Sequence, residues 1–187
     1  MKTLGVLLAA GASRRFGVED KLLAPWRGGV LVGASAALMA QAGCDHLAAI
    51  VSSESVAAAL PAAFDVVRIA PGQEMSVSFR AACRHAETLG AQRLLIALGD
   101  MPGLRVATLQ RLLDGAQSGA CQFEGARMPP ALLLPADWQT ALSDKADQGA
   151  RATLRALPET ALIPLTAAEA QDIDTRADLD QARQGDG

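Results

Sequence analysis

The sequence predicts a single α/β domain with a doubly wound, mostly parallel sheet that is flanked by helices. The first observation behind this prediction is that short apolar runs of strand length alternate with longer alanine-rich stretches of helix length. The second is that half of the 187 residues are apolar and only 3% are aromatic, which suits one substantial core. We expect the domain to cover residues 1–183 and the tail, residues 184–187, to fray.

The apolar runs have the uninterrupted character of strands that are covered on both faces of a parallel sheet. The predicted strands, in chain order, are residues 4–9, 47–51, 66–69, 94–98, 132–134 and 162–164. The last of them is expected at an edge of the sheet, because Pro164 has no N–H group to donate to a neighbouring strand.

The stretches between the predicted strands are rich in alanine and leucine, which favour helices. The predicted helices are residues 31–42, 54–59, 77–88, 106–116, 136–142, 149–157 and 177–183. In open α/β sheets, ligands bind outside the carboxyl ends of the strands. Two glycine-containing loops therefore become candidates for a binding site, residues 10–29 and residues 99–103.

The overall composition argues against several classes of protein. A formal net charge of −3 does not favour binding to nucleic acid. The three cysteines form no CxxC pair, which indicates neither a zinc site nor a disulfide framework and favours a reducing, cytoplasmic setting. No apolar run approaches the roughly 20 residues that a membrane span needs. The N-terminal run also lacks the layout of a cleaved signal.

The loop after the first predicted strand reads LAAGASRRFGVEDK and is locally basic. The first 29 residues contain five Lys or Arg and two Asp or Glu, a net charge of +3, on a chain with −3 overall. This asymmetry predicts a small anionic ligand. The loop is not a Walker loop, because Val18 follows Gly17 where a lysine is required. It is not a dinucleotide fingerprint either, because Ser13 replaces the second glycine.

We predict that this loop binds the anion through backbone N–H groups around Gly11, which would form an anion nest. Arg15 and Lys21 would add positive charge, and arginine can bind a phosphate through two hydrogen bonds. The alternative interpretation is a basic turn exposed to solvent.

Five segments, in this order, resemble the MobA-like nucleotidyltransferases, and more closely the branch that includes molybdenum cofactor cytidylyltransferases. They are LAAGASRRFG with Lys21, EMSVSFRAA (74–82), LIALGDMPG (95–103), DQGARATL (147–154) and DIDTRADL (172–179). The resemblance implies a Rossmann-like nucleotidyltransferase fold. It also implies Mg²⁺-dependent transfer of CMP from CTP to a phosphorylated molybdopterin, with release of pyrophosphate.

The sequence departs from the pattern of this branch at several points. One extra residue lies between Gly17 and Lys21, Glu74 replaces a glycine, and Ala146 replaces the first glycine of a GDxGAR segment. The stretch GARMPPALLLP lacks the histidine of a Gly-His-Pro-like segment. The later changes concern the half of such enzymes that handles the acceptor.

The resemblance implies that Asp100 and Asp174 ligate Mg²⁺, which takes one or two carboxylates and keeps several waters. Arg15, Lys21 and Asp100 are the implied catalytic residues. Alternatively, Asp100 is a helix cap or turn residue. Asp172 and Asp178 are neighbouring carboxylates, and Asp178 can instead interact with the dipole of a helix.

The implied nucleotide-binding residues are Leu8, Ala9, Ala10, Gly11, Ser13, Arg15, Lys21, Ser76, Ser78, Arg80 and Gly99. Guanylyl-transferring relatives carry Gly-Gly where Ala10-Gly11 stands, so this form favours cytosine. Ser76 can alternatively cap a helix. Asp147 and Arg151 are the implied acceptor-binding residues, and their alternative is an i,i+4 helix pair.

The expected partners are a nucleoside triphosphate and a phosphorylated acceptor, molybdopterin first, together with a molybdenum hydroxylase or its maturation chaperone. No nucleic acid or membrane partner is expected. The first alternative is a sugar- or polyol-phosphate acceptor, or GTP as donor. The second is a non-catalytic nucleotide-binding accessory protein for molybdoenzyme maturation. A dinucleotide-dependent oxidoreductase is disfavoured, because Ser52 and Ser53 occupy the position of an acidic ribose ligand.

Overall fold

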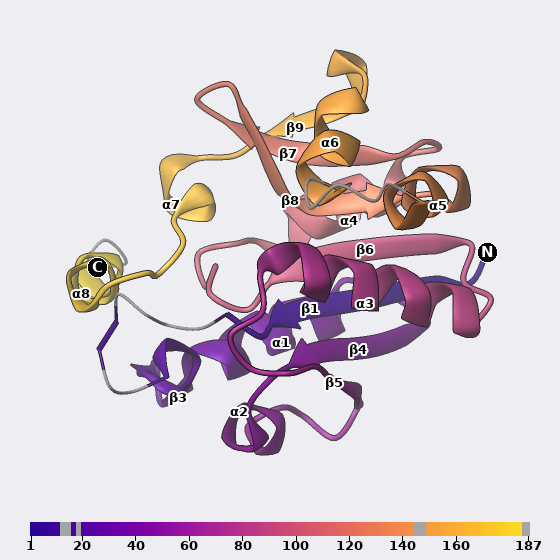
Figure 1. Cartoon of the computed structure of the whole chain (residues 1–187). Helices are drawn as coiled ribbons and strands as arrows, with labels where there is room; N and C mark the ends of the chain where they lie inside the picture. The colour runs from indigo at the N-terminus through magenta and orange to yellow at the C-terminus, as the bar shows by residue number, and fades with distance from the viewer. Residues whose placement is uncertain (12–15, 18–19, 144–148, 185–187) are drawn as a thin grey trace.

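The computed structural model describes residues 1–11, 16–17, 20–143 and 149–184, and within them the core is a seven-stranded sheet of order β5-β4-β1-β6-β8-β7-β9 (Figure 1). The strands are β1 (Thr3–Ala9), β4 (His46–Val51), β5 (Phe64–Arg68), β6 (Arg93–Leu98), β7 (Gly119–Phe123), β8 (Ala126–Leu133) and β9 (Leu162–Pro164). Strands β1, β4, β5 and β6 run parallel, β8 is antiparallel to β6 and β7, and β9 is parallel to β7. The predicted mostly parallel sheet is therefore confirmed.

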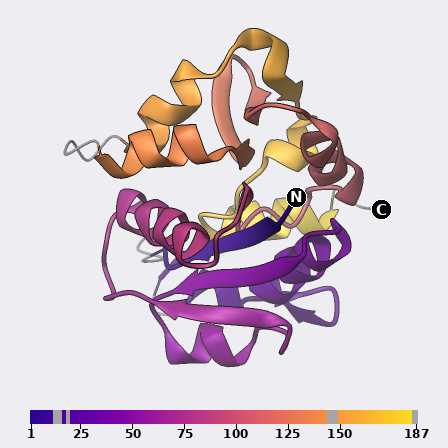
Figure 2. The same cartoon turned by 90° about the vertical axis from the view of Figure 1, so that its right-hand side faces the viewer.

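Helices cover both faces of this sheet. Helix α3 contacts β1, β4 and β6 on one face, beside α5 and α6, whereas α1 and α4 contact each other on the other face (Figures 1 and 2). The helices are α1 (Leu31–Gln41), α2 (Glu54–Ala58), α3 (Met75–Thr88), α4 (Val106–Asp114), α5 (Pro135–Ser143), α6 (Gly149–Ala156), α7 (Ala167–Ala170) and α8 (Arg176–Gln184). Two 3-10 helices, η1 (Lys21–Leu23) and η2 (Glu159–Ala161), and a short hairpin of β2 (Pro25–Trp26) and β3 (Gly29–Val30) complete the fold.

Strand β1 is the centre of the core, and all seven of its residues are buried. Leu8 is in register with Leu98 of β6, and Ala9 is in register with Val51 of β4. The carboxyl ends of the three strands therefore meet at one edge of the sheet, where the loops that follow them lie side by side.

The second half of the sheet differs most from the prediction. Strand β7 has the sequence GACQF, without a long apolar run, and pairing with β8 and β9 holds it in the sheet. Strand β8 begins at Ala126, six residues before the predicted strand of residues 132–134, and ends at Leu133. Its register with β7 shifts at Pro129 and Pro130, so the missing N–H groups of these prolines cost no bonds to β7. Strand β9 lies at the edge, as Pro164 predicts.

The chain after β9 returns to the carboxyl edge of the parallel strands. Ile173 is fully buried, and its N–H donates to the carbonyl of Asp100 at 2.9 Å. Gly103 passes so close to α7 that a Cβ there would lie 2.1 Å from the carbonyl oxygen of Ala168. These contacts fix the segment after β9 against the loop that follows β6. Within the described residues, the helices are too short or too polar to cross a lipid bilayer.

Candidate active site

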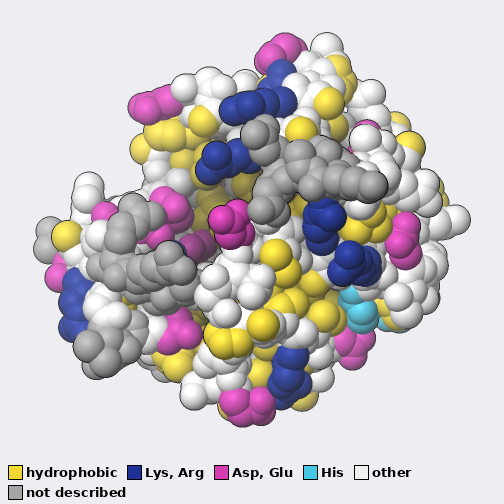
Figure 3. All heavy atoms as spheres, viewed as in Figure 1, with side chains coloured by type: hydrophobic (Ala, Val, Ile, Leu, Met, Phe, Trp, Pro, Cys, Tyr) yellow, Lys and Arg dark blue, Asp and Glu magenta, His cyan; other side chains and the backbone are white. Residues whose placement is uncertain are grey.

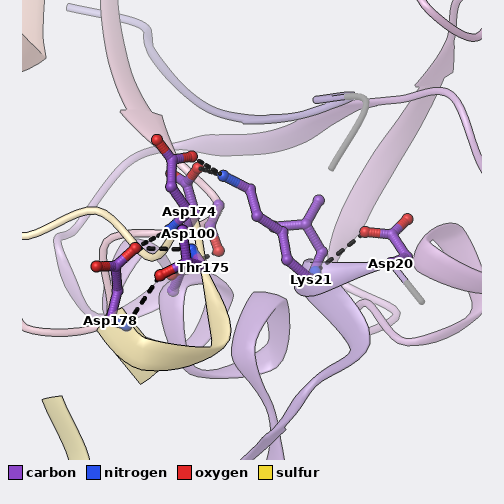
Figure 4. Close-up of polar contacts among 9 residues, drawn as sticks. Asp20, Lys21, Asp100, Asp174, Thr175 and Asp178 are labelled. Atoms are coloured by element: carbon purple, nitrogen blue, oxygen red, sulfur yellow. Dashed lines mark hydrogen bonds and ion pairs between the residues drawn. The ribbon is translucent and has the colours of Figure 1, made fainter. Parts of the chain in front are cut away.

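Lys21, Asp100 and Asp174 meet at the carboxyl edge of the sheet (Figure 4). The Lys21 Nζ lies 2.7 Å from Asp100 Oδ2 and 2.7 Å from Asp174 Oδ1. The Lys21 side chain is only 8% exposed, and those of the two aspartates are 16% and 26% exposed. Three charged groups from distant parts of the sequence therefore form one largely buried cluster.

Local structure positions the residues of this cluster. Lys21 opens the 3-10 helix η1, which Asp20 caps by accepting a hydrogen bond from the N–H of Leu22 at 3.0 Å. Asp100 comes two residues after the end of β6. Asp174 follows Ile173, whose N–H is bonded to the Asp100 carbonyl.

Asp178 has a different role from Asp174, although the sequence alone did not decide which of these neighbouring carboxylates belongs to the site. Its carboxylate accepts hydrogen bonds from the N–H groups of Asp174 and Thr175, at 3.1 and 2.7 Å, and so caps α8 (Figure 4). The Asp174 carboxylate is instead the one that contacts Lys21.

The electrostatics of the cluster favour a charged lysine. Burial alone would lower the pKa of Lys21, but the charge of Asp100 and hydrogen bonds to Asp100 and Asp174 outweigh it, so that this pKa is raised. Burial raises the pKa of the neighbouring Asp172 carboxyl, and the charges of Asp174 and Asp100 raise it further. The cluster is thus an acidic site with a resident cation.

One atom of the cluster indicates that the site suits a metal ion. Asp100 Oδ1 is buried and has no hydrogen-bond partner within the described residues, although Oδ2 of the same carboxylate contacts Lys21. Buried polar atoms without a partner are rare and call for a ligand. No group of three or more His, Cys, Asp or Glu side chains is arranged for a metal in the described part of the chain. The donor set is therefore two carboxylates, which fits Mg²⁺ completed by water and substrate oxygens.

A cavity of about 190 Å³ lies next to the cluster. Six of the residues predicted from the sequence line it: Leu8, Ala10, Gly11, Lys21, Ser78 and Asp100. Sequence reasoning assigned neither Gln73 nor Met75 to the site, although both contribute to the wall. Gln73 precedes α3 and Met75 is its first residue, where the structure leaves this apolar residue 55% exposed.

Other predicted residues lie around this cavity without lining it. Ala9 is buried at the end of β1, and Gly99 donates its N–H to the Leu8 carbonyl at 2.9 Å. Ser76 is buried in the first turn of α3, and Arg80 lies one turn further along the same helix.

Arg151 is exposed on α6, which contacts α3. Ser13, Arg15 and Asp147 lie outside the described residues. In the view of Figure 1, acidic side chains lie near the middle and left of the surface, with Lys and Arg side chains above and to their right (Figure 3). This mixture of charges suits a cation together with an anionic substrate.

Larger cavities occur elsewhere but lack the charged cluster. One of about 810 Å³ lies between α1 and the segment around Gly103 and Glu169. It contains neither Lys21 nor the two aspartates, so the chemistry of the lining, rather than volume, identifies the candidate site. Burial raises the pKa of the Cys44 thiol to about 11 and those of Cys83 and Cys121 to about 12, which makes them poor nucleophiles.

Comparisons with known proteins identify the family. The MobA-like NTP transferase domain matches residues 5–161. The chain is 33% identical to the molybdenum cofactor guanylyltransferase of Xanthomonas euvesicatoria, over 74% of this chain and 68% of that protein. It is 36% identical to the nicotine blue oxidoreductase of Paenarthrobacter nicotinovorans, over 62% of this chain and 57% of that protein. The chain thus spans little more than half of this second relative.

The fold also matches solved structures. Rv0371c of Mycobacterium tuberculosis superposes with a TM-score of 0.83 at 25% identity, over 98% of both chains. A manganese complex of the same protein superposes with a TM-score of 0.79 at 23% identity, over 98% of this chain and 99% of that one. The domain match includes the loop after β1 and the strand before Asp100. The chain therefore belongs to the MobA-like NTP transferase family.

Proposed function

We propose that this nucleotidyltransferase transfers CMP from CTP to a phosphorylated molybdopterin, with Mg²⁺ as cofactor. The observation that carries the proposal is the arrangement of Lys21 beside two carboxylates, at the rim of the cavity below Gly11. One carboxylate oxygen, Oδ1 of Asp100, lacks a hydrogen-bond partner within the described residues. These groups match what transfer from a nucleoside triphosphate needs.

In the proposed reaction, an oxygen of the acceptor phosphate attacks the α-phosphorus of CTP. The bond between that phosphorus and the bridging oxygen of the β-phosphate breaks, and pyrophosphate leaves with the electron pair. Protein groups contribute mainly by positioning and by neutralising charge. Asp100 and Asp174 would hold Mg²⁺, which when bound neutralises charge on the phosphates. Lys21 would balance charge on the departing pyrophosphate, assisted by Arg15.

The acceptor is the less constrained half of the proposal. A relative that is 33% identical is named for molybdenum cofactor guanylyl transfer, which supports a molybdopterin acceptor. Arg80 on α3 and Arg151 on the adjoining α6 are cations suited to the phosphate of such an acceptor, and Asp147 completes the proposed set. The product would serve a molybdenum hydroxylase, directly or through its chaperone.

The donor base is proposed from Ala10 and Gly11, which stand where guanylyl-transferring relatives carry two glycines. The Ser52 hydroxyl donates to the Ala10 carbonyl at 3.3 Å and so fixes this end of β1 beside the cavity. The name of the Xanthomonas relative favours GTP instead, so the choice of base is tested separately. The buried thiols support a reducing, cytoplasmic setting, and we propose that residues 1–183 act as one domain.

The decisive experiment measures pyrophosphate release and product mass with CTP, GTP and ATP, each with molybdenum-loaded pterin and Mg²⁺. We expect a cytidylyl product and release only when both substrates are present. Good turnover with GTP and none with CTP would overturn the proposal that the donor base is cytosine. Turnover with sugar or polyol phosphates, but not with the pterin, would overturn the acceptor. Tight nucleotide binding without any turnover would favour an accessory protein.

A second candidate follows from the relative named nicotine blue oxidoreductase, at 36% identity. Three features oppose a dinucleotide site here. Ser53 caps α2, and Glu54, the nearest carboxylate, is exposed and paired with Arg68. The first α-helix described after β1 begins only at Leu31, so no described helix starts beside Gly11. Oxidation of NADH or NADPH by an electron-accepting dye in the presence of the protein would support this candidate, and its absence would exclude it.

A further inference from the structure

The Lys21 ammonium occupies the position that a divalent cation would approach. It is 2.7 Å from one oxygen of each carboxylate, and a hard divalent cation coordinates carboxylate oxygens at about 2.0–2.6 Å. Asp100 uses Oδ2 for Lys21, so the unpartnered Oδ1 lies on the same small group. A dication on these carboxylates would therefore lie within a few ångströms of a positive charge that is mostly shielded from water.

Two positive charges this close repel each other strongly where little water separates them. The carboxylates of Asp100 and Asp174 are, moreover, already neutralised in part by Lys21. A bare divalent cation must displace the ammonium and leave it without its two charge partners. A cation that arrives with a triphosphate brings new negative oxygens for the ammonium.

The local structure allows such an exchange of partners by the lysine side chain alone. The backbone of Lys21 is held in η1 by the Asp20 cap. Its four-carbon side chain lines the same cavity of about 190 Å³ that Gly11 borders. The Lys21 ammonium can therefore turn from the carboxylates toward a phosphate at Gly11 without any movement of the main chain.

We propose that Lys21 is a specificity-determining counter-ion, which makes the Asp100–Asp174 pair accept a divalent cation only together with a triphosphate. This inference rests on the proposed function for the identity of the site. It adds that cation and nucleotide binding are coupled through one side chain. Because coupling is reciprocal, the cation raises the affinity for the triphosphate by the same factor.

The test is a titration of the full chain with MnCl₂, monitored by the electron paramagnetic resonance of free Mn²⁺, without nucleotide and with tripolyphosphate or CTP. Each titration is compared with the same titration without protein, because tripolyphosphate and CTP themselves bind Mn²⁺, and only the additional binding that the protein causes is counted. We expect weak binding of bare Mn²⁺ to the wild type and binding at least ten times tighter when tripolyphosphate is present. Lys21→Met should bind bare Mn²⁺ about tenfold or more tighter than the wild type, because the competing charge is gone. It should also lose most of the enhancement by tripolyphosphate.

Two variants serve as controls. Lys2→Met removes the same charge at the opposite end of β1, where the ammonium donates to the Leu89 carbonyl, and should bind Mn²⁺ as the wild type does. Lys21→Arg keeps the charge and should keep bare Mn²⁺ binding weak. Equal affinity of wild type and Lys21→Met for bare Mn²⁺ would overturn the proposal.

If Lys21→Met fails to fold, the Mn²⁺ affinity of the wild type with and without tripolyphosphate still tests the coupling. Equal Mn²⁺ affinity with and without tripolyphosphate would refute the coupling. None of these measurements requires transfer, a particular base or a particular acceptor. A wrong donor or acceptor in the proposed function therefore leaves the outcome for Lys21 unaffected, and the two failures remain distinguishable.

Discussion

Two acidic residues of the C-terminal segment, Glu169 and Asp174, are five positions apart and have opposite environments. Glu169 Oε1 accepts from Thr108 at 2.5 Å, and Oε2 accepts from Arg105 at 2.6 Å and from the hydroxyl and N–H of Thr166 at 2.9 and 3.2 Å. Its side chain is 3% exposed. Asp174 is 26% exposed and faces Lys21 and Asp100, whose Oδ1 has no hydrogen-bond partner within the described residues.

This difference indicates that the Glu169 carboxylate stabilises the fold, whereas the Asp174 carboxylate belongs to the candidate active site. The hydrogen bonds that Glu169 accepts from Arg105 and Thr108 join α7 to α4, and those from Thr166 cap α7 itself, so any loss of its charge acts on folding. Burial alone would raise the pKa of Glu169, but the hydrogen bonds from Arg105, Thr108 and Thr166 outweigh it and lower this pKa to about 2. Asp100 instead keeps one carboxylate oxygen, Oδ1, without a hydrogen-bond partner within the described residues, which suits a group that must receive a ligand.

The largest effect is expected for Asp100→Asn, which should reduce activity and leave the fold intact. We expect the rate of CMP transfer to fall on the order of 10²–10³-fold or more, because charge stabilisation of that size is lost when one positioned group is removed. Pyrophosphate release under saturating CTP measures the rate. Thermal unfolding of the same preparation shows whether the fold persists.

Asp65→Asn is the matched control for this variant. Asp65 is an exposed aspartate on β5, so the same chemical change there should leave the rate unaltered. Full activity of both Asp100→Ala and Asp174→Ala would refute the proposed metal-binding roles.

Glu169→Gln is expected to act on stability instead. Four donor groups on three residues lose a charged acceptor in a buried position, so the free energy of unfolding should fall by about 2 kcal/mol. Urea denaturation at pH 7 measures this difference. A loss below about 0.5 kcal/mol would show that the network contributes only as much as an exposed ion pair.

The dependence of this effect on pH has a definite sign. The pKa of Glu169 is lowered from 4.5 to about 2 on folding, so the folded state binds the proton less readily than the unfolded state. The stabilisation is complete above pH 4.5 and is lost as the pH falls toward 2. The difference in unfolding free energy between wild type and Glu169→Gln should therefore shrink over that interval. A difference that stays constant would contradict the lowered pKa.

The parallel half of the fold was predictable because β1, β4 and β6 are continuous apolar runs, whose burial on two faces leaves a direct trace in the sequence. Strand β7 and the β2–β3 hairpin were not, because pairing with distant strands, rather than their own composition, makes them extended. The motifs, through the family resemblance, pointed to Lys21, Asp100 and Asp174 as separate site residues. The meeting of Lys21 with Asp174, 153 residues away, depends on the Ile173–Asp100 backbone bond and could not be read from either segment alone.

Gly103→Ala tests whether the two carboxylate regions are held by the same close contact. An added Cβ would lie 2.1 Å from the carbonyl oxygen of Ala168, so α7 must move away from the loop of Asp100. We expect the free energy of unfolding to fall by about 1–2 kcal/mol, as for other insertions into a packed site, and the transfer rate to fall with it.

Gly33→Ala is the matched control, because a Cβ there would meet only Val30 Cγ2 at 3.6 Å. Gly33 lies in the first turn of α1, where this change should stabilise by up to about 0.5–1 kcal/mol. Equal effects of the two variants would show that the Gly103 contact has no special role.

The smallest effect is expected for Glu54→Gln, which removes a third kind of charged contact. Glu54 and Arg68 are 2.7 Å apart, as close as the groups of the active cluster, but their side chains are 77% and 57% exposed. Water already solvates both charges, so stability should change by less than about 0.5 kcal/mol in denaturant titration at low and high salt. Nucleotide transfer should also be unaltered, since Glu54 is absent from the lining of the cavity below Gly11. A large loss of NADH-dependent activity on this substitution would instead reveal Glu54 as a ribose ligand, and would make burial a poor guide to function in this chain.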